Sequence, residues 1–247
     1  MSLNQTSVSV ARFVAIHSIL RLDARHPLAR AAIIDPHAMH RIVMSGFYGW
    51  TVPGDPDPRA QMGILNTWSL DLRTNDLLLI VQSRIQPDWT AIPKDALIDE
   101  VTSLSVDQRV KQGDVFSFRA VLNPLRDREV VVTTPRGREV QRKRVADNTV
   151  KHAREWFAER LQVAGAEAIG PRGVRRIGAT CDPEKLDVRI LPKLNFPDRQ
   201  RGMKLGRAEY KGALTVTEPA TFVNALTDGI GKARAYGSGL ILIRSLV

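Results

Sequence analysis

Cysteine is almost absent from this chain, which has one cysteine, Cys181, among 247 residues. A single thiol cannot form an intrachain disulfide, and it cannot supply the several thiolates of a cysteine-rich zinc site. The sequence therefore predicts a reducing, cytoplasmic setting. A chain of this length is sufficient for one large domain or two small ones, and either can bury a hydrophobic core.

Long apolar runs are absent as well. No run reaches the roughly 18 residues that a membrane-spanning helix requires. The N-terminus, Met1 to Gln5, is polar and has no basic segment, so we expect no signal peptide. The sequence also has no long basic amphipathic helix, and we therefore expect no membrane partner.

Acidic residues are too few to balance the basic ones, since 36 Lys and Arg face 26 Asp and Glu for a net charge of +10. The excess is local. Residues 126–144 hold seven basic and three acidic residues, and residues 199–211 hold five basic and one acidic residue. A polyanion is the expected partner of such a protein, and nucleic acid is favoured in the absence of a membrane helix. A basic surface without such a partner is the alternative.

Periodicity in the first half of the chain predicts a mixture of strands and helices. Asp35 followed by Pro36 is typical of a helix start, with aspartate as N-cap and proline in the first turn. The expected strands are 7–20, 63–70, 76–84 and 115–122, and the expected helices are 27–34 and the one that begins at Asp35-Pro36.

The second half repeats this order after the basic segment 126–144, which we interpret as a connector that is partly a hairpin. A helix is expected over 148–165 with Gly165 as its cap. Strands at 185–193 and 208–217, a helix over 218–227, a glycine-rich loop and a last strand at 240–246 follow.

The fold class that these patterns favour is α+β, with two ferredoxin-like (RRM-like) domains in tandem and antiparallel sheets. The expected division is an N-terminal domain over 1–125, a basic connector over 126–145 and a C-terminal domain over 146–247. A single mixed α/β domain is the alternative.

The glycine-rich loop between the last helix and the last strand does not fit either common nucleotide-binding motif. Arg234 stands where a dinucleotide fingerprint needs its third glycine, and Ala233 replaces the Ser/Thr of a phosphate-binding P-loop. Its backbone amides and cations suit a phosphodiester, and Tyr236 suits base stacking; a simple helix cap and turn is the alternative. The candidate RNA-binding residues here are Gly229, Gly231, Lys232, Arg234, Tyr236, Gly237 and Gly239.

Two histidines, His37 and His40, lie three residues apart and therefore share one face of the helix that begins at Asp35. Imidazoles titrate near pH 6.5 and suit proton transfer from a ribose 2′-hydroxyl and to a leaving 5′-oxygen. Arg41 is next to them and suits stabilisation of a phosphorane. A metal site would need a third ligand, and no motif in the sequence supplies one.

Two segments together carry a family resemblance: residues 25–41, which contain both histidines, and residues 229–240, the glycine-rich loop with the residue after it. They resemble the CasE-type CRISPR-associated endoribonucleases of type I-E (Cascade) systems. The segment Phe118-Arg119-Ala120…Asn123-Pro124 is similar to the family's Arg-Ala-Asn-Pro element, with two residues inserted.

The resemblance implies a tandem ferredoxin-like protein that cuts the stem-loop repeat of precursor CRISPR RNA without a metal or other cofactor. It also implies that the protein stays on its product beside other Cascade subunits. The family's catalytic histidine falls on His40, and a tyrosine common three residues earlier is replaced by His37. The family's basic hairpin falls on the 199–211 segment, whose candidate RNA-binding residues are Arg199, Arg201, Lys204 and Arg207.

Two other functions remain open at this point. A non-catalytic RNA-binding subunit of a ribonucleoprotein would use the same charge and loops, although aromatic residues, which ferredoxin-like sheets often use to bind RNA, are only 6% of the chain. A small-molecule or metal-dependent enzyme built on His37 and His40 is the third hypothesis.

Overall fold

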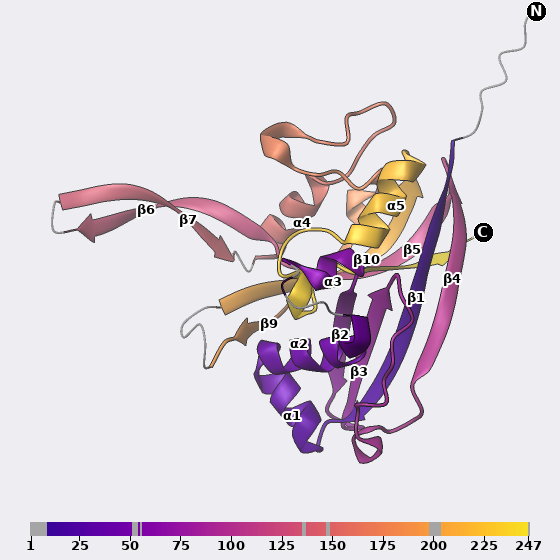
Figure 1. The fold of residues 1–247 in the computed structure, drawn as a ribbon. Coiled ribbons are helices and arrows are strands. Elements are labelled where there is room, and N and C mark those ends of the chain that lie inside the picture. The colour runs from indigo at the N-terminus through magenta and orange to yellow at the C-terminus, as the bar shows by residue number, and fades with distance from the viewer. Residues whose placement is uncertain are drawn as a thin grey trace, which may run out of the picture.

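The computed structural model describes residues 9–50, 54, 56–134, 137–146, 149–197 and 204–246, with backbone only for 126–130, 132–134, 139, 141–146 and 172. It contains two antiparallel sheets with helices packed beside them, which confirms the predicted α+β class and the tandem ferredoxin-like arrangement (Figure 1). None of the helices in these described ranges is long and apolar enough to cross a membrane.

The first sheet is formed by the N-terminal part of the chain, in the strand order β2-β3-β1-β4. This is the ferredoxin-like order, although the place of the second helix is taken by a short 3-10 turn at Lys94–Ala96. The elements are β1 (Val10–Asp23), α1 (Pro27–Ile34), α2 (Pro36–Ser45), a 3-10 turn at Tyr48–Trp50, α3 (Pro58–Gln61), β2 (Leu65–Asp71), β3 (Asp76–Ser83) and β4 (Thr102–Lys111).

The second sheet repeats the same order with β9-β10-β5-β11, and β8 also pairs with β10. Helices α4 and α5 occupy the two helix positions of the ferredoxin-like unit. The elements are β5 (Val115–Leu122), α4 (Val150–Ala158), β8 (Ala179–Thr180), β9 (Asp187–Asn195), β10 (Lys204–Val216), α5 (Pro219–Asp228) and β11 (Ile241–Ser245), with 3-10 turns at Pro171–Gly173, Pro183–Lys185 and Arg234–Tyr236.

One strand assignment differs from the expectation. We expected residues 115–122 to complete the first unit, but β5 lies at the centre of the second sheet, between β11 and β10. The strand that completes the first sheet is β4, whose polar and largely exposed sequence has little strand signal of its own. It forms because β1 is long enough to pair with β4 from Val10 to Ile19.

Helix α4 is shorter than predicted, because it ends at Ala158 rather than near Gly165. A tight turn follows the helix, in which the amide of Leu161 donates a hydrogen bond to the carbonyl of Ala158. The amide of Gln162 then donates to the carbonyl of Ala179, next to β10. A tertiary backbone hydrogen bond therefore competes successfully with continuation of the helix.

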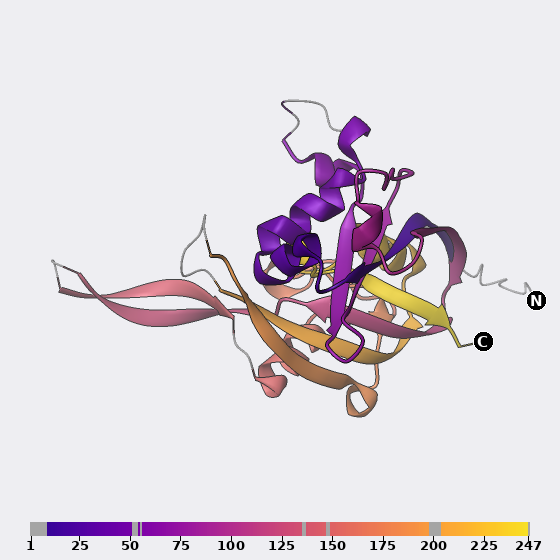
Figure 2. The same cartoon turned by 90° about the horizontal axis from the view of Figure 1, so that it is seen from below.

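The basic segment forms a two-stranded hairpin, β6 (Leu125–Thr134) and β7 (Gly137–Ala146), with Thr134 opposite Gly137 at its tip. Figures 1 and 2 show that this hairpin extends away from the two sheets, and that β9 and the start of β10 reach toward the same side of the molecule. The backbone thus brings both basic segments to one side.

Two large hydrophobic cores, together with a small cluster of Leu194, Phe196 and Leu205, hold the fold together. One lies under α1 and α2 in the first unit, and the other lies between the second sheet and helices α4 and α5. Strand β1 joins them, because Leu20 and Leu22 belong to the first core while Phe13 and Ala15 belong to the second. The buried amide of Gln82 on β3 also donates to the carbonyl of Leu226 on α5 at 2.8 Å.

Candidate functional site

Helix α2 carries the two histidines of the candidate site. It starts as the sequence predicts: the Asp35 carboxylate accepts a hydrogen bond from the amide of His37 at 2.9 Å, and Pro36 occupies the first turn. Met39, Ile42 and Val43 are buried in the first core. This buried face fixes the helix and leaves His40 at the edge of the core.

A pocket of about 510 Å³ lies beside His40, between α2, α3 and the loop that follows α5. Three cationic side chains, Arg59, Lys232 and Arg234, share this pocket with one imidazole. The complete lining is His40, Met44, Pro56, Asp57, Pro58, Arg59, Gly231, Lys232, Ala233, Arg234, Ala235 and Tyr236. Its composition is that expected of a site for an anionic ligand such as a phosphodiester.

The environment lowers the pKa of His40 below its ordinary value of 6.5. Burial of the imidazole is the largest cause, followed by the positive charge of Arg59 and then by His37. A hydrogen bond with the backbone of Ala235 acts in the opposite direction. His40 is therefore neutral at pH 7 in the free protein and able to accept a proton.

Arg59 is the main site residue that the sequence analysis missed. Its helix begins with Asp57 as N-cap and Pro58, the same pair of residue types that begins α2. The guanidinium donates from Nη1 to the carbonyl of Ile64 at 2.7 Å and lies 3.7 Å from Asp57. Burial lowers the pKa of Arg59, yet the side chain stays charged at any physiological pH. The Asp57-Pro58 pair repeats the helix start at Asp35-Pro36, and this was the sequence signal from which the helix that carries Arg59 could have been predicted.

His37 and Arg41, which we expected next to His40 in catalysis, do not line the pocket. His37 packs edge-on against Phe196 and Tyr236, with ring centroids 5.1 and 5.4 Å apart. The Tyr236 ring in turn lies edge-on to the His40 ring, with the two ring centroids 6.3 Å apart. The Arg41 side chain is 70% exposed and lies 3.7 Å from Asp35. His37 is thus placed to position Tyr236, and Arg41 faces solvent.

The four glycines of the loop all have positive φ, between 71° and 101°. A Cβ on Gly237 would approach Trp68 to 2.9 Å, and one on Gly239 would approach the carbonyl of Ile230 to 2.9 Å. Gly229 and Gly231 are equally close to protein atoms. These glycines are therefore required by the turn and its internal packing. The lysine, arginine and tyrosine between them are the groups that reach the pocket.

The structure gives different outcomes for the candidate RNA-binding residues of the 199–211 segment. Arg199 and Arg201 lie outside the described residues, and Lys204 is exposed at the start of β10. Arg207, which we expected to contact RNA, is buried: its Nε and Nη2 donate to the carbonyl of Pro192 at 3.3 Å, and its Cζ lies 4.4 Å from the Trp68 ring centroid. Burial lowers its pKa to about 10. We revise its role to holding β9, β10 and β2 together.

Clusters of three or more His, Cys, Asp or Glu side chains able to hold a metal ion do not occur within the described ranges.

Comparisons with known proteins give a family and a fold. The family model described as "CRISPR associated protein" matches residues 17–245. No curated protein matches the chain.

Solved structures resemble the model over almost its whole length. Cas6e from Escherichia coli str. K-12 is 18% identical with a TM-score of 0.65, covering 94% of this chain and 100% of that one. Thermus thermophilus Cse3, bound to an RNA representing a pre-cleavage complex, is 22% identical with a TM-score of 0.63, covering 94% and 99%. A chain of a CRISPR RNA-guided surveillance complex is 17% identical with a TM-score of 0.55, covering 94% and 100%. These likenesses establish a shared fold.

Proposed function

Because this chain belongs to the CRISPR-associated protein family, we propose that it is a metal-independent endoribonuclease that cleaves the stem-loop repeat of precursor CRISPR RNA. We further propose that it stays bound to the mature RNA as a Cascade subunit. The solved Cse3 bound to RNA and the surveillance-complex chain of the same fold support RNA and Cascade subunits as partners.

The observation that carries this proposal is the position of His40. Its imidazole is half-buried in the wall of a pocket whose charged side chains include three cations, and it is the only histidine in that lining. Phosphate affinity and a proton-transfer group thus meet in one place. A purely structural histidine would not need three cations around the same cavity.

The chemistry that fits this arrangement is in-line attack by a ribose 2′-hydroxyl. The 2′-oxygen bonds to the adjacent phosphorus as the bond from phosphorus to the 5′-oxygen breaks, leaving a 2′,3′-cyclic phosphate and a 5′-hydroxyl. One proton leaves the 2′-hydroxyl and one is delivered to the 5′-oxygen. Neutral His40 accepts the first, as general base catalysis requires, and solvent water supplies the proton that the departing 5′-oxygen takes up.

The cations of the pocket have a separate role. Negative charge accumulates on the non-bridging phosphate oxygens during attack, and fixed positive groups that need no reorganisation stabilise it. Arg59 is held by its hydrogen bond to the Ile64 carbonyl and by Asp57, and Arg234 is held by a hydrogen bond from Nη1 to the carbonyl of Asp228 at 2.7 Å. Lys232 and Arg234 add two further positive charges to the pocket from the glycine-rich loop.

The direct test is incubation of the protein with its own labelled repeat RNA in excess EDTA, followed by end-group analysis of the fragments. We expect a single cut at the base of the stem, a cyclic phosphate or 3′-phosphate on one fragment and a 5′-hydroxyl on the other. Cleavage that stops in EDTA and returns with a divalent metal would refute the metal-independent mechanism. Tight binding without any product would identify an RNA-binding subunit instead.

The lowered pKa of His40 predicts an acid limb in the pH profile of cleavage. The base form is present above the folded-state pKa, so kcat/KM should fall as pH drops through a value below 6.5. Arg59→Met removes a positive charge that lowers the pKa of His40. The acid limb of this variant's pH profile should therefore lie at higher pH than that of wild type, even if the overall rate also changes. An identical limb in both proteins would contradict the assignment.

A further inference from the structure

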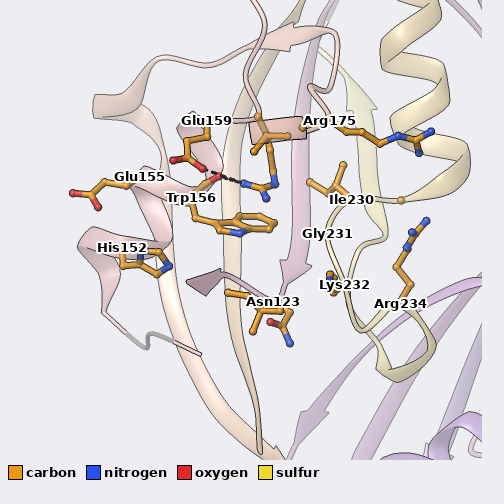
Figure 3. Close-up of a pocket in the computed structure, with 15 residues that line it drawn as sticks. Asn123, His152, Glu155, Trp156, Glu159, Arg175, Ile230, Gly231, Lys232 and Arg234 are labelled. Atoms are coloured by element: carbon orange, nitrogen blue, oxygen red, sulfur yellow. Dashed lines mark hydrogen bonds and ion pairs between the residues drawn. The ribbon is translucent and has the colours of Figure 1, made fainter. Parts of the chain in front are cut away.

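A second pocket, of about 680 Å³, lies on the other side of the glycine-rich loop (Figure 3). Its walls come from the end of β5, from α4, from the 3-10 turn at Pro171–Gly173 and the residues after it, and from the loop itself. Gly231, Lys232 and Arg234 line both this pocket and the His40 pocket. One short loop therefore separates the two cavities, and a bound strand can contact both.

Trp156 lines this pocket with the small part of its ring that is not buried, since the residue is only 5% exposed, and it is held firmly in its orientation. The guanidinium carbon of Arg160 lies 3.3 Å from its ring centroid, and Arg160 also donates to the Trp156 carbonyl. Gly231 approaches the edge of the indole so closely that a Cβ there would lie 3.0 Å from it. A fixed indole of this kind is a typical partner for a nucleobase.

Asn123 supplies a polar group with no hydrogen-bond partner among the residues that the structure describes. Its side chain is 1% exposed, and both the amide nitrogen and the amide oxygen lack a hydrogen-bond partner. Burying both atoms without hydrogen bonds costs free energy. A ligand that bonds to them recovers that free energy as binding affinity. A side-chain amide offers a donor beside an acceptor, which pairs with a base edge in two hydrogen bonds. His152 Nε2, also buried and unpartnered, lines the same cavity.

The charges of the pocket suit the backbone of the same nucleotide. Lys232 and Arg234 line the pocket from the glycine-rich loop, whereas the Arg175 side chain points away from Trp156 and Asn123, toward α5 (Figure 3). Arg175 lies 3.9 Å from Asp228, and Glu159 lies 4.0 Å from Arg160. Glu155 also lines the cavity. Aromatic and amide groups on one side and cations on the other match a base and its phosphate.

We infer that this pocket binds one unpaired nucleotide of the RNA, immediately next to the cleaved phosphodiester. The base lies against Trp156 with one edge hydrogen-bonded to Asn123, while its phosphate faces Lys232 and Arg234. The inference rests on the proposed function, since it assigns the shared loop to a single RNA strand that passes from one pocket to the other. Asn123 then determines specificity at this nucleotide, while His40 acts on the bond beside it.

The test is an abasic scan of the repeat hairpin. The RNA carries deoxyribose at the cut-site nucleotide to prevent cleavage, and one base at a time is removed at three nucleotides on either side of the cut. With the wild-type protein, we expect an increase in Kd of about 10-fold at one unpaired position next to the cut. Asn123→Ala should bind the intact RNA about 10-fold more weakly and should lose less affinity than wild type when the base at that position is removed, because only the contact with Trp156 remains to be lost.

The controls separate this site from the proposed catalysis and from misfolding. Asn224→Ala removes an exposed asparagine from α5 and should behave as wild type. Asn123→Asp replaces the donor by an acceptor and should change which base is preferred at the identified position. Asn123→Ala removes polar atoms that have no hydrogen-bond partner among the described residues and should not lower the unfolding temperature, whereas the buried carboxylate of Asn123→Asp should lower it.

Three outcomes would overturn the inference. The first is a scan in which Asn123→Ala and wild type lose affinity equally at every position, even while cleavage in EDTA confirms the proposed function. The second is binding of free 5′-AMP or 5′-GMP that depends on Asn123 together with a flat scan, which would make the site one for a free nucleotide. The third is absence of any hairpin binding by wild type, which would remove the proposed function as well.

Discussion

Replacing His40 by alanine should reduce the cleavage rate at least about 100-fold while hairpin affinity is largely kept. In the proposed mechanism the imidazole transfers the proton, whereas the phosphates are bound by Arg59, Lys232 and Arg234, which line the same pocket and are untouched by the change. The measurement is single-turnover cleavage of the repeat RNA at saturating protein, with Kd determined separately on RNA that cannot be cut.

His37→Phe is the matched control for this experiment. Phenylalanine retains an aromatic ring against Phe196 and Tyr236 but cannot transfer a proton. We expect a loss of less than about 10-fold, because a positioning role is mainly kept. An equal loss in the two variants would mean that His37 also transfers a proton. A His40→Ala protein that cleaves at the wild-type rate would refute the proposed mechanism.

Deoxyribose at the nucleotide on the 5′ side of the cut should abolish cleavage entirely. The 2′-oxygen is the nucleophile, and no other group of the proposed reaction can replace it, so the expected loss is limited only by the sensitivity of the assay. Binding should change little, because one hydroxyl is a small part of a hairpin contact that rests on phosphates and shape.

The same substitution one nucleotide further in the 3′ direction is the control, and it should leave the rate nearly unchanged. Product from the first RNA, cut at the same bond, would show that water rather than the ribose attacks. That outcome would favour a different class of nuclease, even if His40 were essential to it.

Much of the fold was predictable from the sequence because its signals are local. The Asp35-Pro36 pair begins α2, a proline and a glycine delimit α5, and the glycine-rich loop joins that helix to β11. The tandem α+β architecture follows from the order of these elements. The position of His40 at the edge of a buried helix face follows from helical spacing alone.

Other features required the tertiary structure. The sequence does not determine that β5 leaves the first unit to form the centre of the second sheet, since a buried strand has the same pattern beside either partner. It also does not show that α4 stops at Ala158, because the hydrogen bond from Gln162 to Ala179 joins segments far apart in the chain.

The candidate site divides in the same way. The sequence by itself determined which residue types were available: an imidazole on a capped helix, and cations within a glycine-rich loop. Only the tertiary structure decided which of them meet: it brings Arg59 to His40, turns Arg207 inward onto Trp68 and leaves Asn123 with no hydrogen-bond partner in the described part of the chain. The physical reason is that residue type and helical spacing act over a few residues, whereas burial, pKa and unmet hydrogen bonds depend on segments that fold together from distant parts of the chain.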